Sequence, residues 1–306
     1  MIERNRSELL KLQALPLERK IGITAARIAE FHVATSGKCY VSFSGGKDSA
    51  VLLHIARKLY PDIAAVFCDT GLEYPEVKEY VYSQDNIQVI RPDMSFPEVI
   101  KKYGFPVISK EVSQTIYEAR LGYPSVVAKI TGSRKGKDGK RNRFNMESYK
   151  YLLDAPFAMS HRCCEFLKKK PFKKYQNKTM FPIVGTIASE SALRASQWVK
   201  SGCNSFKKGK EKSAPLSIWT EQDILRYIKV SGLKIPSVYG EIIQDGDSLK
   251  LSGVSRTGCI FCMFGLKYDG PRDRFHRLQE SHPKLYRYCM EELGLEPVLE
   301  YLRRTK

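Results

Sequence analysis

A six-residue glycine loop, Ser44-Gly45-Gly46-Lys47-Asp48-Ser49, constrains this chain more than any other feature of its sequence. It follows the aromatic and β-branched run 38–43 and precedes a periodic apolar run at 50–60, which predicts a strand, a loop and a helix in that order. Glycines let backbone amides approach phosphate oxygens, and the helix N-terminus carries partial positive charge toward the same point. The spacing differs from that of the Walker loop, which has four residues between its glycines. The segment therefore predicts a phosphate-binding loop at the end of a buried strand.

Strands and helices are predicted to alternate along most of the chain. Apolar runs predict further strands at 63–68, 87–90 and 181–186, and periodic apolar positions predict helices at 19–34 and 220–229. Thr220 can cap the last of these helices. Because alternating strands and helices form parallel sheets, we expect an α/β fold with a parallel sheet covered by helices on both faces.

The sequence also suggests three consecutive parts. We expect an N-terminal helical segment at 1–36, a nucleotide-binding domain at 37–230, and a C-terminal, cysteine-bearing segment at 231–306. Within the second part, residues 121–150 are basic, glycine-rich and without apolar periodicity, which is typical of a mobile loop. No apolar run approaches the roughly 20 residues that cross a bilayer, and the first residues lack the apolar stretch of a secretion signal. We therefore expect a cytoplasmic protein that does not contact membranes.

The charge of the chain is strongly positive. Its formal net charge is +18 and its isoelectric point is about 9.5, so it attracts polyanions. The basic residues concentrate in three runs at 134–143, 168–174 and 207–212. Such loops suit a phosphate backbone and predict a nucleic-acid partner. The alternative is a basic surface that aids solubility or attracts small phosphorylated substrates.

Four of the eight cysteines form two pairs, Cys163-Cys164 and Cys259-x-x-Cys262. In a reducing compartment such pairs indicate metal ligands rather than disulfides, and sulfur ligands suit zinc or an iron–sulfur cluster. Two of the remaining cysteines, Cys39 and Cys68, lie in apolar strands and are interpreted as core residues. The other two, Cys203 and Cys289, are ambiguous. A lowered pKa could let Cys203 carry sulfur, although a plain surface thiol is the simpler interpretation.

Residues 37–265 resemble the PP-loop superfamily, the adenine nucleotide alpha hydrolases. The resemblance rests on the glycine loop, on Asp69-Thr70-Gly71-Leu72-Glu73-Tyr74-Pro75-Glu76, on the segment from Gly185 to Arg194, and on Pro215-Leu216 with Trp219 and Asp223. The chain looks closest to the branch that contains phosphoadenylyl sulfate (PAPS) reductase, adenylyl sulfate (APS) reductase and the DNA phosphorothioation enzymes. In APS reductases, a tandem Cys-Cys and a later CxxC hold one 4Fe-4S cluster, so the resemblance favours a cluster on Cys163, Cys164, Cys259 and Cys262.

The resemblance also implies a nucleotide site for ATP and Mg²⁺. Its residues are Ser42, Ser44, Gly45, Gly46, Lys47, Asp48, Ser49, Asp69, Thr70, Gly71, Glu73, Gly185, Glu190 and Arg194. Among these, Lys47, Asp48, Asp69 and Arg194 would be catalytic. Arg194 would stabilise negative charge, and Asp69 with Glu73 would help to hold magnesium. Without the resemblance, a strand-end turn and a helix cap explain Asp69 and Glu73 equally well.

Two activities follow as expectations. The first is ATP-dependent sulfur transfer to a nucleic acid, with DNA favoured over tRNA and with a cysteine desulfurase or a sulfonucleotide as sulfur donor; the enzyme could be a homodimer. The second is reduction of APS or PAPS to sulfite. Those reductases use a cysteine in a C-terminal Glu-Cys-Gly segment, whereas this sequence has no cysteine after Cys289 and keeps the full loop of an ATP-cleaving enzyme. A non-catalytic nucleic-acid-binding module is a third possibility, and the intact loop argues against it.

Overall fold

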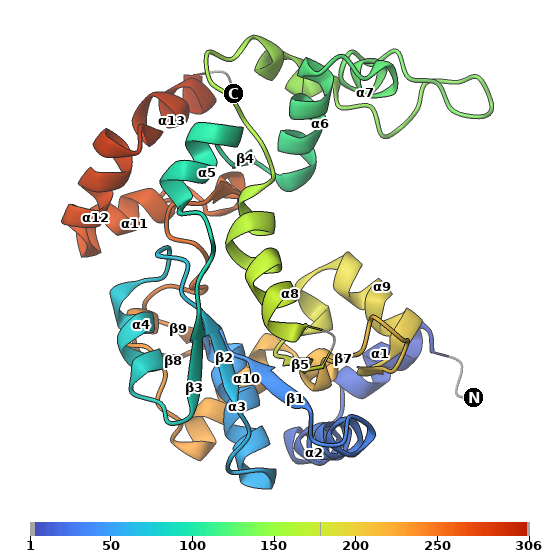
Figure 1. The fold of residues 1–306 in the computed structure, drawn as a ribbon, viewed down its shortest axis with the longest axis vertical. Helices are drawn as coiled ribbons and strands as arrows, with labels where there is room; N and C mark the ends of the chain where they lie inside the picture. The colour runs from blue at the N-terminus through green and yellow to red at the C-terminus, as the bar shows by residue number, and fades with distance from the viewer. Residues whose placement is uncertain (1–3, 178, 305–306) are drawn as a thin grey trace. The chain divides into compact units, whose positions relative to one another are not determined.

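The computed structural model describes residues 4–177 and 179–304. Contacts divide the chain into two compact units, each built from several segments (Figure 1). Unit 1 comprises the described residues up to Asp69, then Glu73–Arg91 and Pro171–Thr257, and unit 2 comprises Thr70–Leu72, Pro92–Lys170 and the described residues from Gly258. The sequence had suggested three consecutive parts. The units interleave because the chain leaves the main sheet after its third strand and returns to it some ninety residues later.

Unit 1 holds the main sheet and the helices around it. Its elements are α1 (Arg6–Gln13), α2 (Leu17–Ala34), β1 (Cys39–Ser42), α3 (Lys47–Leu59), β2 (Ala65–Cys68), α4 (Pro75–Tyr82), β3 (Ile87–Ile90), β5 (Phe181–Val184), α9 (Ala192–Ser201), β6 (Asn204–Ser205), β7 (Lys212–Ser213), α10 (Glu221–Ser231), β8 (Ile242–Asp245) and β9 (Ser248–Leu251). Helix α8 (Lys170–Gln176) begins at the last residue of a unit 2 segment and continues into unit 1.

The main sheet has the strand order β3-β2-β1-β5-β7-β6. All neighbouring strands are parallel except β6 and β7, which form an antiparallel hairpin at the edge. Every residue of β2 is buried, as are the first three residues of β1, so both faces of the central strands are covered. These observations confirm the predicted α/β class with a parallel sheet.

The order of the strands creates a switch point between β1 and β5. From β1 the chain adds β2 and β3 on one side, and it later adds β5 on the other side of β1. In open parallel sheets, the crevice for ligands lies beyond the carboxyl ends of the strands at such a point. The glycine loop follows β1 and Gly185 follows β5, so both lie at this crevice.

Local sequence signals explain the main helices of unit 1. Helix α3 begins at Lys47 directly after the glycine loop and ends at Leu59, shortly before Pro61. Helix α10 begins after Thr220, whose side chain caps it in a reciprocal capping box with Asp223, as the sequence predicted. Cys39 and Cys68 are 4% and 7% exposed, which confirms their interpretation as core residues.

Unit 2 is mainly helical. Its elements are α5 (Phe96–Tyr103), β4 (Val107–Ile108), α6 (Lys110–Arg120), α7 (Pro124–Ile130), β10 (Met263–Phe264), α11 (Arg274–Ser281), α12 (Pro283–Arg287) and α13 (Leu295–Arg304). Strands β4 and β10 pair in parallel. The segment at 121–150, which was predicted as a mobile loop, contains helix α7 and an isolated antiparallel bridge between Lys135 and Arg141. Pro124 suits the first turn of α7, and Ile130 anchors the helix because it is fully buried. No described helix has the length and apolar character that a membrane span requires.

Candidate functional site

The glycine loop in unit 1 has a backbone that other residues would distort. Gly45 has a φ of +72°, and a Cβ atom there would lie 2.6 Å from Val81 and 2.7 Å from Val77 of helix α4. The hydroxyl oxygens of Ser44 and Ser49 are 3.1 Å apart, and the amide of Ser44 donates to the Ser49 hydroxyl over 3.2 Å. The loop is therefore a preformed turn with its hydroxyls gathered at the start of α3.

Two residues that the sequence analysis did not identify cover the first amide of helix α3. The Lys47 amide donates to the hydroxyl of Tyr239 over 3.0 Å, and this hydroxyl also lies 2.8 Å from the Thr257 hydroxyl. A Cβ on Gly46 would come within 3.2 Å of both hydroxyl oxygens. The Tyr239 hydroxyl thus accepts from a backbone amide of the kind that binds phosphate at helix N-termini. A phosphate bound there would replace the hydrogen bond between Lys47 and Tyr239.

Lys47 and Asp48 are largely buried at this position. The Lys47 ammonium lies 3.6 Å from Asp48 and 3.4 Å from Glu221, and only 4% of the residue is exposed. Burial raises the pKa of Asp48, and the charge of Lys47 acts in the opposite direction. Asp48 Oδ1 is buried and accepts no hydrogen bond from the described residues. A buried carboxylate oxygen with free acceptor capacity fits a hard cation such as Mg²⁺.

The segment after β5 brings further charge to the loop. A Cβ on Gly185 would lie 3.1 Å from the backbone oxygen of Asp48, so only glycine allows this close approach. Beyond it, Arg194 forms an ion pair with Glu190, and Arg256 lies 3.6 Å from the same carboxylate. Burial, followed by the charge of Arg256, lowers the pKa of Arg194. Two guanidinium groups share one carboxylate, which leaves positive charge for an anionic ligand. The sequence analysis identified Glu190 and Arg194 but not Arg256.

Asp69 follows β2, as predicted, and is surrounded by cations. Its carboxylate lies 3.1 Å from the Lys78 ammonium and 3.9 Å from the Arg91 guanidinium, and it accepts a hydrogen bond from the Tyr82 hydroxyl over 3.1 Å. The positive charges already balance this carboxylate, so Asp48 suits a magnesium ion better than Asp69 does.

The remaining predicted residues fall in both units. Ser42 ends β1 beside Val66 and Val184 of the neighbouring strands, and Glu73 is a partly exposed residue of unit 1. Thr70 and Gly71 belong to unit 2, where the Thr70 hydroxyl accepts a hydrogen bond from the amide of Leu72 over 3.3 Å.

The four paired cysteines lie together in unit 2. They line one small cavity whose other lining residues are Leu72, Phe96, Pro106, Leu167 and Lys168. Cys163 and Cys164 precede a π-helical turn at Glu165–Lys169, and the amide of Cys262 donates to the Cys259 carbonyl over 3.1 Å. The turn from Cys259 to Cys262 is anchored by a hydrogen bond of 2.9 Å from the amide of Ile260 to the Leu72 carbonyl.

The environment of Cys164 favours its thiolate form. A hydrogen bond from Cys163, assisted by the charges of Lys110 and Lys168, lowers the pKa of Cys164 to about 5. The same hydrogen bond, together with burial, raises the pKa of Cys163, and burial raises that of Cys262 to about 11. In the part of the chain that the structure describes, no three His, Cys, Asp or Glu side chains are arranged to hold a single metal ion. Four sulfur donors around an otherwise largely apolar cavity nevertheless fit the donor chemistry of an iron–sulfur cluster.

The other two cysteines lack the features of a reactive thiol. Burial raises the pKa of Cys203, so the lowered pKa that the sequence had left open for this residue is wrong. Cys289 is fully buried, burial raises its pKa to about 12, and its thiol donates to the Tyr286 carbonyl over 3.2 Å. Burial of both sulfurs disfavours the charged form, which is the nucleophile.

Several characterised and uncharacterised proteins are similar in sequence to this chain. It is 24% identical to the "Uncharacterized protein MJ0973" of Methanocaldococcus jannaschii over 82% of this chain and 46% of that protein. It is 28% identical to the "Sulfate adenylyltransferase subunit 2" of Proteus mirabilis over 77% of this chain and 69% of that protein. It is 23% identical to the "Adenosine 5'-phosphosulfate reductase" of Staphylococcus epidermidis strain RP62A over 52% of this chain and 76% of that protein. The chain thus spans about half the length of the first of these relatives.

A family comparison covers most of the chain. The "Phosphoadenosine phosphosulfate reductase domain" matches residues 38–152 and 108–263, two overlapping stretches that include the glycine loop, the segment after β5 and both cysteine pairs. The match agrees with the resemblance that the sequence motifs carried. The chain belongs to the phosphoadenosine phosphosulfate reductase domain family, in the PP-loop superfamily.

Proposed function

We propose that this protein uses ATP and Mg²⁺ to adenylylate an oxygen of a nucleic acid and then replaces that oxygen with sulfur. The proposal rests on buried Lys47 beside the unsatisfied Asp48 oxygen, at the start of α3 and at the switch point of a parallel sheet. A sulfonucleotide has no pyrophosphate leaving group, whereas ATP presents a triphosphate and a magnesium ion, for which this pair is suited.

Different residues of unit 1 would bind the phosphates of ATP and its magnesium ion. The amides and hydroxyls of the glycine loop and the N-terminus of α3 bind phosphate oxygens, and Lys47 adds positive charge. Asp48 supplies an oxygen ligand to magnesium. Arg194 and Arg256 stabilise the charge that develops when the α-phosphorus is attacked.

The reaction proceeds in two displacements. A non-bridging oxygen of the acceptor phosphate attacks the α-phosphorus of ATP, the bond to the bridging oxygen breaks, and pyrophosphate leaves. Hydrosulfide, which a thiol reductant releases from the persulfide of a donor such as a cysteine desulfurase in a two-electron step, then attacks the acceptor phosphorus and loses its proton to solvent. AMP departs with the former acceptor oxygen. Neither displacement changes the oxidation state of sulfur, so the thiol reductant is consumed only where hydrosulfide is released from the persulfide donor.

The four paired cysteines of unit 2 would hold the cofactor for the sulfur-transfer step. Cys163, Cys164, Cys259 and Cys262 would hold a 4Fe-4S cluster, one thiolate on each iron, and such a cluster would supply electrons for the release of hydrosulfide. Lys110 and Lys168 lie beside Cys164 and would offset the negative charge of four thiolates.

The acceptor is a nucleic acid because the chain carries a net charge of +18. A DNA backbone is favoured, which makes the product a DNA phosphorothioate, and a tRNA base is the variant. Reduction of APS or PAPS to sulfite is a second candidate, since one relative is named an adenosine 5'-phosphosulfate reductase. The described residues that could serve as its nucleophile, Cys203 and Cys289, both have raised pKa values.

The experiment is an anaerobic incubation of iron-loaded protein with ATP, Mg²⁺, sulfide and either duplex DNA or tRNA, assayed for pyrophosphate and AMP. A parallel reaction measures sulfite from APS and PAPS. Pyrophosphate release that nucleic acid stimulates, that is lost in Lys47→Ala and that yields sulfur-labelled product only with intact Cys262, supports the proposal. Sulfite release without cleavage of ATP would overturn it in favour of the reductase.

A further inference from the structure

A wide groove of about 1230 Å³ lies in unit 1 and has no role in the nucleotide site described above. It is lined by residues of the N-terminal helices α1 and α2, of α9, and of the β6–β7 hairpin. Six basic side chains face it (Arg4, Arg27, Lys200, Lys207, Lys210 and Lys212), against two acidic ones (Glu8 and Glu30). Glu30 and Arg27 lie 2.8 Å apart and neutralise each other, and Glu30 also accepts from the side-chain amide of Asn204, so five basic side chains remain against Glu8. The groove is therefore a basic channel.

Four lysine side chains of this groove are available to bind an anion. Lys200, Lys207, Lys210 and Lys212 are exposed, and none forms an ion pair with another residue of the described chain. The amide of Lys210 donates to the Lys207 carbonyl over 2.8 Å, and Gly209 has a φ of +75°, so Lys207 and Lys210 lie on a tight turn between β6 and β7. Such unpaired cations on a fixed turn suit successive phosphates of a chain.

An aromatic side chain lies among these lysines. Phe206 is 49% exposed, and its ring stacks on Phe31 with a centroid distance of 5.9 Å and an interplanar angle of 29°. Phe31 itself is fully buried in α2 and fixes the position of the exposed ring. A flat ring that is supported on one face and open to solvent is a stacking platform for a base.

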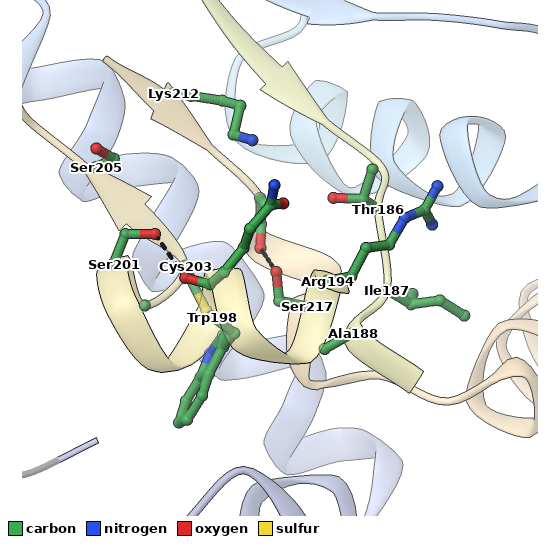
Figure 2. A pocket seen from close by; sticks show the side chains of 13 residues that line it. Thr186, Ile187, Ala188, Arg194, Trp198, Ser201, Cys203, Ser205, Lys212 and Ser217 are labelled. Atoms are coloured by element: carbon green, nitrogen blue, oxygen red, sulfur yellow. Dashed lines mark hydrogen bonds between the residues drawn. The ribbon is translucent and has the colours of Figure 1, made fainter. Parts of the chain in front are cut away.

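A narrow cavity of about 30 Å³ adjoins the groove, and Figure 2 shows it from close by. The two cavities share Trp198, Cys203 and Lys212, among other lining residues. At its other end the narrow cavity is lined by Thr186 and Arg194, which follow β5. Because Arg194 belongs to the candidate nucleotide site, a chain lying in the groove lies close to that site, although the cavity itself has room for only about one water molecule.

We propose that this groove binds a single-stranded segment of nucleic acid beside the nucleotide site. The inference rests on the proposed function, since it assigns the acceptor of that reaction to a surface. A duplex keeps its bases stacked on one another and cannot use Phe206, whereas a single strand offers both phosphates for the lysines and a free base for the ring.

The test is the binding of a fluorescent 12-nucleotide single strand, as DNA and as RNA, and of the matching DNA duplex, measured by anisotropy without ATP at several salt concentrations. The groove variants are Phe206→Ala and the triple variant Lys207→Gln, Lys210→Gln, Lys212→Gln. The matched control is the triple variant Lys135→Gln, Lys137→Gln, Lys140→Gln, which removes the same charge from unit 2. Thermal melting checks that each variant is folded.

Single strands should bind more tightly than the duplex. The groove triple should weaken single-strand binding at least tenfold and reduce the slope of log K against log salt by about 2, since each phosphate contact contributes roughly 0.7. Phe206→Ala should weaken it by roughly 5- to 100-fold, as expected for the loss of one stacked base. The control triple should keep at least a third of the wild-type affinity.

Wild-type affinity in both groove variants, or tighter binding of the duplex, would overturn the inference. The outcome for DNA against RNA identifies the acceptor class. Failure of the proposed function is a separate result: nucleic acid would then bind in the groove with the expected losses but would not stimulate pyrophosphate release. Conversely, stimulated pyrophosphate release that the groove variants leave intact would keep the proposed function and remove the acceptor from this groove.

Discussion

A buried ion pair in unit 1 gives the sharpest prediction about stability. Lys20 of α2 is 1% exposed, and its ammonium lies 2.7 Å from the Asp223 carboxylate and donates to the Gln13 carbonyl. The same carboxylate oxygen accepts hydrogen bonds from the amide and the hydroxyl of Thr220, which closes the capping box of α10. Replacing Lys20 by Met keeps the volume and leaves a buried, uncompensated charge.

Removal of one partner of a buried pair costs about 3–5 kcal/mol of the free energy of unfolding, because the other charge stays desolvated. Lys20→Met should therefore destabilise unit 1 by roughly that amount. The double variant Lys20→Met with Asp223→Asn should recover more than half of the loss, since Asn carries no charge and its oxygen can still accept from the Thr220 amide. The control is Arg27→Met on the same helix, whose exposed ion pair with Glu30 is worth about 0.5 kcal/mol.

Urea unfolding monitored by tryptophan fluorescence is the assay, because both tryptophans, Trp198 and Trp219, belong to unit 1. The midpoint should fall for Lys20→Met at a nearly unchanged slope. A loss no greater than that of Arg27→Met would refute the assigned burial of the pair. A double variant that is no more stable than Lys20→Met would refute the assignment of the cost to the charge left on Asp223.

Two further predictions concern the nucleotide site. Gly185→Ala places a Cβ 3.1 Å from the backbone of Asp48, and neither backbone segment can shift easily. The change should therefore lower the free energy of unfolding by about 1–3 kcal/mol and weaken nucleotide binding, as measured by calorimetry. Gly22→Ala, in α2 with open space around it, should instead stabilise the protein by about 0.5–1 kcal/mol, and an equal effect of both changes would contradict the packing argument. Burial raises the pKa of Asp48, so the native state binds its proton more tightly than the unfolded chain does, and stability is lost as pH rises through the raised pKa. Asp48→Asn should therefore gain stability relative to wild type as the pH rises above about 4, the usual pKa of an aspartate, while losing Mg²⁺-dependent pyrophosphate release. A stability difference that is independent of pH would show that burial does not disfavour the charge.

The sequence predicted the elements whose signals are local. The strands near 39–42, 65–68, 87–90 and 181–184 were predicted from short apolar runs, and the capped start of α10 from Thr220. Helix α7 was missed because it is short, so its few apolar residues did not establish a period within a basic, glycine-rich segment. The β8–β9 hairpin was also missed, although Asp245-Gly246 is a recognisable turn signal.

What the sequence determined by itself was the chemistry available: a glycine loop with lysine and serine side chains at a strand-to-helix junction, and two cysteine pairs. A motif of six residues carries its residue types and its glycine backbone freedom wherever the rest of the chain folds. Only the tertiary structure decided which distant residues surround it. Tyr239 and Thr257 meet the loop about two hundred residues along the chain, and Arg256 approaches Glu190 in the segment after β5. Asp69 is surrounded by cations, and Cys203 acquires a raised pKa. These outcomes depend on which segments bury their apolar faces together, and no pattern within a single segment carries that information.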